Sequence, residues 1–167
     1  MVSNTKRISD NVVNGWENVG VEEAENTIQM VSFLISNGLY GMDISNIREI
    51  IKVDRITHVP GSSEYIEGVM NLRGMVIPIV DSGKLLGLSK ITPSDDRRII
   101  IIEIQSQTQI GLLVDAVIDI VNILPDRIGP PPATLGKDKA KYIKGEVQIG
   151  VKLMAILDMK DAGSHGD

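Results

Sequence analysis

The chain has 167 residues, which is enough for one domain or two small ones that bury a hydrophobic core. Hydrophobic residues make up 43% of it, the net charge is −5, and cysteine is absent. The lack of a basic block argues against nucleic-acid binding, and the lack of cysteine excludes disulfides, thiolate nucleophiles and cysteine-type zinc sites. Because only five aromatic residues occur, we expect Ile, Val, Leu and Met to fill the core of narrow β-sheets.

Residues 1–27 are rich in Asn, Glu and Val without a clear period, and we expect them to form a mobile tail. The alternative for this segment is a docking element around Trp16. No apolar run reaches about 18 residues and no leader peptide opens the chain, so we expect a cytoplasmic protein without membrane insertion. Residues 161–167 are expected to be a flexible C-terminal tail.

The first predicted elements follow the N-terminal tail. Residues 27–36 and 38–44 have the composition of strands, and the Asn-Gly pair between them predicts a β-hairpin. The next residues predict a short helix with Asp43 as its N-cap. Its apolar positions, at helical spacing, are Ile44, Ile47, Ile50 and Ile51. Residues 55–60 then predict a brief strand that ends at a proline.

The second half of the chain repeats the first. The aligned segments are "YGMDISNIREIIKV" (40–53) with "IGLLVDAVIDIVNI" (110–123), "YIEGVMN" (65–71) with "YIKGEVQ" (142–148), and "IPIVD" (77–81) with "MAILD" (154–158). A Pro- and Gly-rich loop at 124–141 accounts for the longer second repeat. Two mostly extended repeats predict duplicated small β-barrels, with a boundary near 89–96. Because one such barrel has a marginal core, we expect the two to pack together and leave a groove.

Candidate catalytic residues are few. His58 has no second His or Cys at ligand spacing, and we expect a partly exposed strand residue there. Asp81 and Asp158 end equivalent strands and could form the paired-carboxylate site of a small hydrolase, but capping of the following turn is the simpler interpretation. No phosphate-binding glycine motif occurs. We therefore expect a protein that is not an enzyme and binds no metal or cofactor.

Arg73 interrupts one of the most apolar stretches of the chain, within "NLRG" at a predicted turn between two strands. The second repeat has "VQIG" there, so we align Gly150 with Gly74 and find no counterpart of Arg73. The turn therefore does not require a guanidinium group. Two compatible interpretations stay open: Arg73 pairs with Glu49 or Glu67 to stabilise the barrel, or it contacts a partner.

The chain resembles the CheW family of chemotaxis coupling proteins. The similarity runs from "FLISNGLYGMDISNIREI" through "ITHVPGSSEYIEGVMNLRGMVIPIVD" and "GLLVDAVIDIVNI" to "YIKG" and "MAILDM", about residues 28–160. It implies an all-β fold with short helices, in which two SH3-like five-stranded β-barrel subdomains, about 28–90 and 97–160, are intertwined. It also implies a non-catalytic adaptor. Such an adaptor joins the cytoplasmic tips of methyl-accepting chemotaxis receptors to the regulatory domain of the CheA histidine kinase, at membrane-associated arrays.

The resemblance also implies which residues bind these partners. The receptor-binding candidates are Ile44, Ile47, Glu49, Gly68, Asn71 and Arg73. The loop before "YIKG" is a candidate contact with the kinase or with neighbouring array modules. Its residues are Ile128, Pro131, Thr134 and Leu135. We expect a monomer when the protein is isolated, and an adaptor of twitching or gliding motility is the alternative that the sequence does not separate from chemotaxis.

Overall fold

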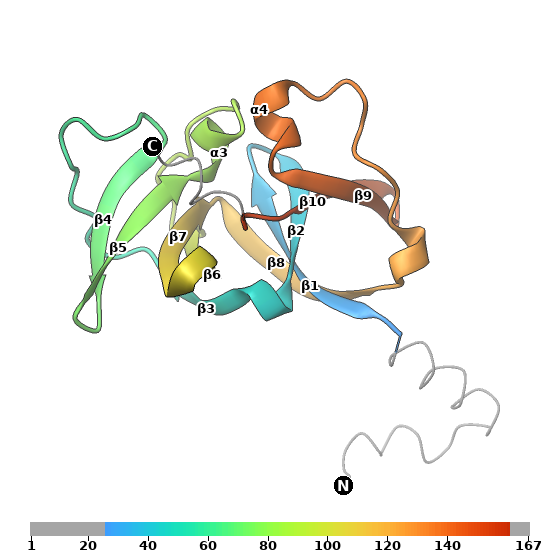
Figure 1. The fold of residues 1–167 in the computed structure, drawn as a ribbon, viewed down its shortest axis with the longest axis horizontal. Coiled ribbons are helices and arrows are strands. Elements are labelled where there is room, and N and C mark those ends of the chain that lie inside the picture. Colours follow the sequence, from blue (N-terminus) through green and yellow to red (C-terminus); the bar gives the residue numbers. More distant parts are fainter. Residues whose placement is uncertain (1–25, 161–167) are drawn as a thin grey trace, which may run out of the picture.

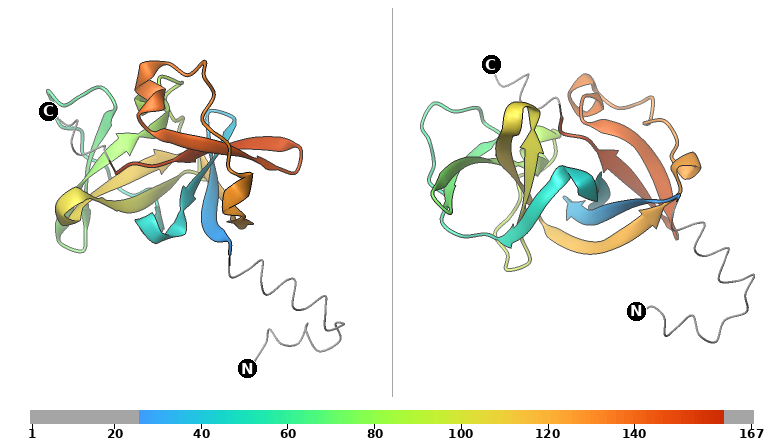
Figure 2. Two further views of the ribbon diagram at one scale, coloured as in Figure 1. Left: turned by 45° about the vertical axis from the view of Figure 1, so that its right-hand side comes forward. Right: turned by 60° about the horizontal axis from the view of Figure 1, so that its bottom comes forward.

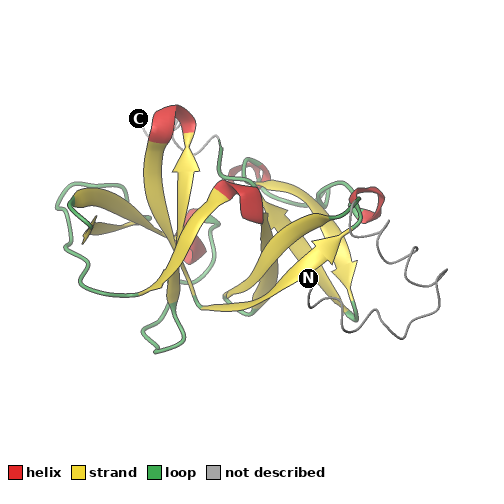
Figure 3. Cartoon of the chain, turned by 90° about the horizontal axis from the view of Figure 1, so that it is seen from below, coloured by secondary structure: helices red, strands yellow, loops and turns green. Residues whose placement is uncertain are grey.

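The computed structural model describes residues 26–160, so the two expected tails, 1–27 and 161–167, lie almost entirely outside the described residues. Strands dominate this part of the chain, and its helices are single turns (Figure 3). The strands are β1 (Ile28–Ile35), β2 (Gly38–Asp43), β3 (Ile47–Lys52), β4 (Ile66–Leu72), β5 (Met75–Asp81), β6 (Arg98–Ile104), β7 (Thr108–Val114), β8 (Ala116–Ile123), β9 (Ile143–Ile149) and β10 (Lys152–Leu157). The short helices are η1 (Ile44–Asn46), α3 (Ser82–Leu85), η2 (Gln105–Gln107), η3 (Pro125–Arg127) and α4 (Lys137–Ala140).

The strands form two curved five-stranded sheets that lie side by side (Figures 1 and 2). We call them barrel A, with strand order β8-β1-β2-β10-β9, and barrel B, with strand order β3-β6-β7-β5-β4. In each barrel one parallel pair, β2 with β10 or β7 with β5, joins strands that are otherwise antiparallel. The predicted fold class of two SH3-like barrels is confirmed.

Each barrel combines strands of both repeats. Strands β1–β5 match β6–β10 in order and nearly in length, which confirms the predicted duplication. Barrel A takes the hairpin β1–β2 from the first repeat and β8, β9 and β10 from the second, and barrel B does the reverse. The chain crosses between the barrels through η1, after β2, and through Asp115, between β7 and β8. The ranges 28–90 and 97–160 therefore describe the repeats, and each repeat contributes to both barrels.

The prediction of a short helix at residues 44–51 is wrong. Asp43 does cap a turn, because its Oδ1 accepts a hydrogen bond of 2.9 Å from the backbone N of Ser45. However, η1 lasts only three residues, and β3 follows it directly. The register of β3 against β6 shifts between Ile47 and Glu49. Burial alternates along β3, but Glu49 takes one of the less exposed positions and Ile50 is exposed, so the isoleucines have a spacing that resembles a helix.

The predicted β1–β2 hairpin is confirmed, but its loop residues are Ser36 and Asn37 and not the Asn-Gly pair, because Gly38 of β2 already pairs with Ile35. Both loop residues have a positive φ, 47° and 70°, as a type I′ turn requires. The strand predicted at 55–60 is reduced to one antiparallel bridge between Thr57 and Val69.

The main hydrophobic core joins the two barrels. Phe33 and Ile35 of β1 are fully buried in the same cluster as Ile99 and Ile101 of β6. A smaller cluster around Met154 fills barrel A. The larger cluster makes the barrels one packing unit, and aliphatic side chains form most of it, as the composition predicts.

Candidate functional site

The loop between β4 and β5 presents Arg73 at the tip of a tight hairpin. Leu72 and Met75 pair across the hairpin, so Arg73 and Gly74 are its two loop residues. Their φ values, 50° and 87°, are both positive, as in a type I′ turn. The Asn71 side chain accepts a hydrogen bond of 3.0 Å from the backbone N of Gly74 and braces the loop. The hairpin therefore holds Arg73 in a defined backbone conformation.

Arg73 forms an ion pair with Glu49 on β3, so the structure selects Glu49 from the two partners that the sequence left open. Strands β3 and β4 are the two edges of the barrel B sheet, and the pair joins the hairpin tip to the opposite edge. The side chains are 69% exposed for Arg73 and 31% exposed for Glu49. An ion pair this exposed contributes only about 0–1 kcal/mol to folding, and the guanidinium group stays accessible to a partner.

The equivalent hairpin of the second repeat has glycine at the position of Arg73. Because β4 (66–72) matches β9 (143–149), the first loop residue after β9 is the counterpart of Arg73. That residue is Gly150, with a φ of 60°, so Gly150 corresponds to Arg73 and not to Gly74, which corrects the alignment made from the sequence. A left-handed conformation costs a non-glycine residue about 1–2 kcal/mol. Arg73 thus has a backbone conformation that glycine adopts at lower cost, which points to a role for its side chain.

Exposed aliphatic side chains flank the ion pair. Met75 and Val76 begin β5 directly after the loop and are 52% and 65% exposed, and Ile50 follows Glu49 on β3 and is 38% exposed. Sequence reasoning missed Met75 and Val76 as surface residues, because a continuous apolar run does not reveal which of its members face solvent. Their position directly after the loop was the signal that could have identified them. Exposed aliphatic groups beside a fixed charge are typical of a surface that binds another protein.

The other receptor-binding candidates are less accessible. Ile44 and Ile47 are half-buried and pack against the larger core cluster. Gly68 is buried, and a Cβ at this position would lie 2.3 Å from the carbonyl O of Thr57. Close packing of β4 against residue 57 therefore requires glycine at 68. The structure brings three of the six candidates together at the hairpin tip: Glu49, Asn71 and Arg73.

The candidate kinase loop, 124–141, is anchored at two points. Ile128 packs against the cluster inside barrel A, and Leu135 packs against the larger cluster. Pro131 and Thr134 are exposed between these anchors. The loop therefore has fixed ends and an accessible middle.

The two aspartates considered for catalysis both cap turns of the backbone. Asp81 is fully buried, and its carboxylate accepts hydrogen bonds from the backbone N of Lys84 at 3.1 Å and of Ile91 at 3.2 Å. Asp158 accepts a hydrogen bond of 2.9 Å from the backbone N of Lys160. The capping interpretation is confirmed, and the buried carboxylate of Asp81 has no surface for a substrate to reach.

The described residues, 26–160, have neither a metal-ligand cluster nor a membrane-spanning helix. Within this range no group of three or more His, Cys, Asp or Glu side chains could hold a metal ion. His58 is exposed, as predicted, but it follows the isolated bridge residue Thr57 and does not lie in a strand. None of the described helices is long and apolar enough to cross a membrane.

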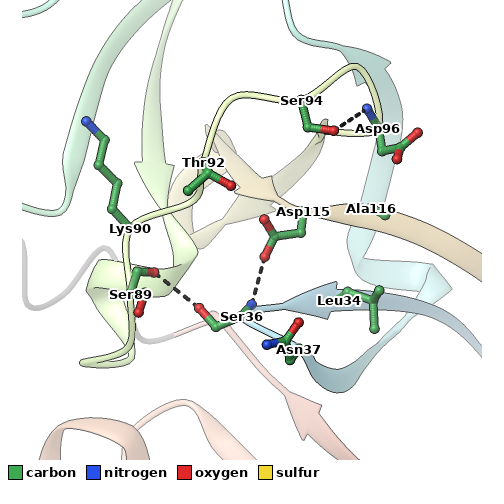
Figure 4. A pocket seen from close by; sticks show the side chains of 10 residues that line it. All are labelled: Leu34, Ser36, Asn37, Ser89, Lys90, Thr92, Ser94, Asp96, Asp115 and Ala116. Carbon is green, nitrogen blue, oxygen red and sulfur yellow. Dashed lines mark hydrogen bonds between the residues drawn. The ribbon is translucent and has the colours of Figure 1, made fainter.

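A polar hollow of about 460 Å³ lies beside the β1–β2 turn and the segment that links the repeats (Figure 4). The Asp115 carboxylate there accepts a hydrogen bond of 2.7 Å from the backbone N of Ser36, and the Ser36 hydroxyl donates to the Ser89 carbonyl at 3.2 Å. These bonds hold the hairpin at the point where the chain crosses between barrels. A smaller, mostly apolar hollow of about 180 Å³ lies in the expected groove, with Tyr65 and Tyr142, equivalent residues of the two repeats, in its lining.

The sequence matches the family model described as "CheW-like domain" over residues 29–165. It is 30% identical over 135 residues to a chemotaxis protein CheW of Treponema pallidum, covering 78% of this chain and 79% of that protein. It is 33% identical over 140 residues to a chemotaxis protein CheW of Thermotoga maritima, covering 82% and 88%. The crystal structure of the scaffolding protein TtCheW from Thermoanaerobacter tengcongensis has a TM-score of 0.74 and 36% identity, covering 81% of this chain and 91% of that one. With its doubled barrel fold and its "NLRG" hairpin, this chain belongs to the CheW family of chemotaxis proteins.

Proposed function

We propose that this protein is a non-catalytic adaptor that couples the cytoplasmic tips of chemotaxis receptors to the CheA histidine kinase, in the cytoplasm at membrane-associated receptor arrays. Membership of the CheW family supports this class of function. The observation that carries the receptor contact is the state of Arg73, which is exposed, paired with Glu49 and held in a left-handed conformation. Such a preorganised group loses little freedom when a partner binds it.

The proposed receptor surface consists of the Glu49–Arg73 pair with Asn71, Met75 and Val76. A guanidinium group has five N–H donors, and one carboxylate engages two of them at most, so Arg73 keeps donors for acceptor groups on the receptor. Burial of a Val or Met side chain contributes about 1.5–3 kcal/mol when it is complete. A receptor tip with an acceptor group for Arg73 and an apolar face for Met75 and Val76 would use both parts of the surface.

The proposed kinase surface is the loop 124–141, with Pro131 and Thr134 at its exposed middle and Ile128 and Leu135 fixing its ends. Residues 128–136 contain no charged side chain. The contact that this loop offers is therefore apolar and hydrogen-bonding in character, in contrast to the charged receptor surface.

Coupling by this protein is positional. The receptor surface belongs to barrel B, whereas the kinase loop pairs with barrel A through Gly129 and Glu146. Because one core cluster joins the barrels, the two surfaces keep a fixed distance and orientation. A rigid adaptor shifts the kinase between its active and inactive states only if its contacts are stronger in one state than in the other.

The experiment that tests this function uses the full chain, a receptor cytoplasmic fragment and CheA. We expect the adaptor to bring receptor fragment and CheA into one sedimenting complex, and kinase activity to depend on all three components. Binding of only one partner, or kinase activity that is independent of the adaptor, would count against the proposal.

A further inference from the structure

Barrel A has an exposed aliphatic surface of its own. It consists of Ile118 and Ile120 on β8, Val151 in the β9–β10 loop and Leu153 on β10, and we call it the barrel A patch. Val151 is 95% exposed and each of the other three is 53% exposed. Four large aliphatic groups on one small barrel exceed the scattered apolar residues that a free surface normally carries.

The repeat places the two halves of this patch near each other. In barrel B the β4–β5 loop reaches β3, through the contact of Arg73 with Glu49. The equivalent elements of barrel A are the β9–β10 loop and β8, in the same strand order, with Asp119 matching Glu49. In barrel A, β8 and β9 are likewise the two edges of the sheet, and Val151 directly follows the loop residue Gly150 after β9.

The patch differs in chemistry from its counterpart. Barrel B carries Arg48, ion-paired with Glu103 at 2.6 Å, and Arg73 at these positions. Barrel A has Ile118 and Gly150 instead. A segment that binds this apolar surface must therefore differ in chemistry from the partner that binds the charged hairpin of barrel B.

The chain enters barrel A beside this patch. Ile28, the first residue of β1, pairs with Ile123 at the end of β8, and Thr27 lines the same surface hollow as Asn122. Ile28 also packs against the same cluster as Ile149, which directly precedes the β9–β10 loop. The segment that precedes β1 therefore starts beside the end of β8 and close to the end of β9.

That segment contains apolar side chains that fit an exposed aliphatic surface. Its apolar residues include Val12, Val13, Trp16, Val19 and Val21. Residues 17–25 also contain four glutamates and no Lys or Arg, and Lys152, which directly follows Val151, is exposed beside the patch. Val21 precedes Ile28 by seven residues, which span about 23 Å when extended, at about 3.3 Å per residue.

We propose that residues 12–25 dock on the barrel A patch of their own chain. Trp16 and the valines cover the exposed aliphatic side chains, and the glutamates face Lys152. Trp16 supplies a large amphipathic contact, and covalent connection gives the segment a high effective concentration at the patch. The inference does not rest on the proposed adaptor function, because it concerns a contact within one chain.

Trp16 is the sole tryptophan, so its fluorescence reports this contact directly. We expect the emission of the full chain to be blue-shifted, and less quenched by acrylamide, relative to a synthetic peptide of residues 1–25. Val151→Asp should remove the blue shift, and because Val151 is almost fully exposed, this substitution leaves the fold intact. Val76→Asp, on the equivalent hairpin of barrel B, is the matched control and should retain the shift.

Salt and dilution complete the test. Lys152→Glu should weaken docking as added salt does, since both reduce the attraction to the glutamates. An emission spectrum identical to that of the peptide would overturn the proposal, and so would equal effects of Val151→Asp and Val76→Asp. A blue shift that disappears on dilution would assign the segment to a second copy of the chain and would also overturn it.

Discussion

Arg73 and Gly150 occupy the same position in equivalent hairpin loops, and both have a positive φ, 50° and 60°. The duplication therefore provides an internal control for the arginine. The second hairpin forms without a side chain at this position, so the backbone does not require one. What Arg73 adds is an exposed guanidinium group paired with Glu49.

Arg73→Gly should separate folding from binding. Glycine relieves the left-handed strain but loses an exposed ion pair and increases the freedom of the unfolded chain, so these effects nearly cancel. We expect the free energy of unfolding to change by less than about 1 kcal/mol, while receptor affinity falls and CheA affinity holds. Chemical denaturation and titration with each partner measure the three quantities.

Arg73→Lys is the companion variant, because it keeps the charge and loses the planar fork. Receptor binding that survives in Arg73→Lys would show that charge alone is recognised. A parallel loss of stability and of both affinities in Arg73→Gly would show that Arg73 serves the fold and not the receptor.

The exchange of hairpins between the repeats predicts a single cooperative unfolding transition. Each barrel needs strands of both repeats, and one core cluster joins them, so neither barrel can unfold alone. Circular dichroism and calorimetry should give coincident transitions. Residues 26–90 and 97–160 expressed separately should each be unfolded, and two resolved transitions in the full chain would contradict the shared core.

Gly68 and Gly145 are equivalent residues that should both be intolerant of a side chain. A Cβ would lie 2.3 Å from the Thr57 carbonyl O in the first case and 2.5 Å from the Gly129 carbonyl O in the second. We expect Gly68→Ala and Gly145→Ala each to lower stability by about 1–3 kcal/mol, as overpacking does. Gly129→Ala is the control, because its Cβ would lie 3.9 Å from the Glu146 carbonyl O, an ordinary van der Waals contact. Thermal melts of the three variants measure the changes in stability.

The two proposed interfaces should differ in their dependence on salt. The receptor surface contains the Glu49–Arg73 pair, so its affinity should fall as ionic strength rises. The kinase loop has no charge between residues 128 and 136, so CheA binding should change little. Titrations at low and moderate salt test both, and a steep loss of CheA affinity would assign kinase binding to a charged surface elsewhere.

Asp81 and Asp158 should affect stability and not activity. Asp81→Asn weakens the hydrogen bonds of a buried carboxylate, and we expect a loss of about 1–3 kcal/mol. Asp158→Asn removes an exposed cap and should cost less, about 0.5–1 kcal/mol. The double variant, assayed below its melting temperature, should still join the receptor to CheA. Loss of coupling in a folded double variant would instead support the paired-carboxylate hypothesis.

Local patterns in the sequence determined the strand content, the first hairpin and the order of the two repeats. Alternating and β-branched segments predict strands without knowledge of their partners, and a duplication is visible as soon as "YIEGVMN" is set against "YIKGEVQ". The length of the motif "YIEGVMNLRGMVIPIVD" was also sufficient for the family resemblance that the comparisons confirm. These features depend on residues that are close together along the chain.

Tertiary structure alone decided which strands pair and which side chains are free. Local patterns could not show that β1 and β2 join the strands of the other repeat, because pairing between distant strands depends on packing and not on local preference. Only the family resemblance implied that the two subdomains are intertwined. The isoleucine spacing at 44–51 predicted a helix because it does not show that Glu49 takes a less exposed position of β3 and Ile50 an exposed one. Glu49 rather than Glu67 meets Arg73, and Met75 and Val76 face solvent, only because barrel closure places the β4–β5 tip against β3.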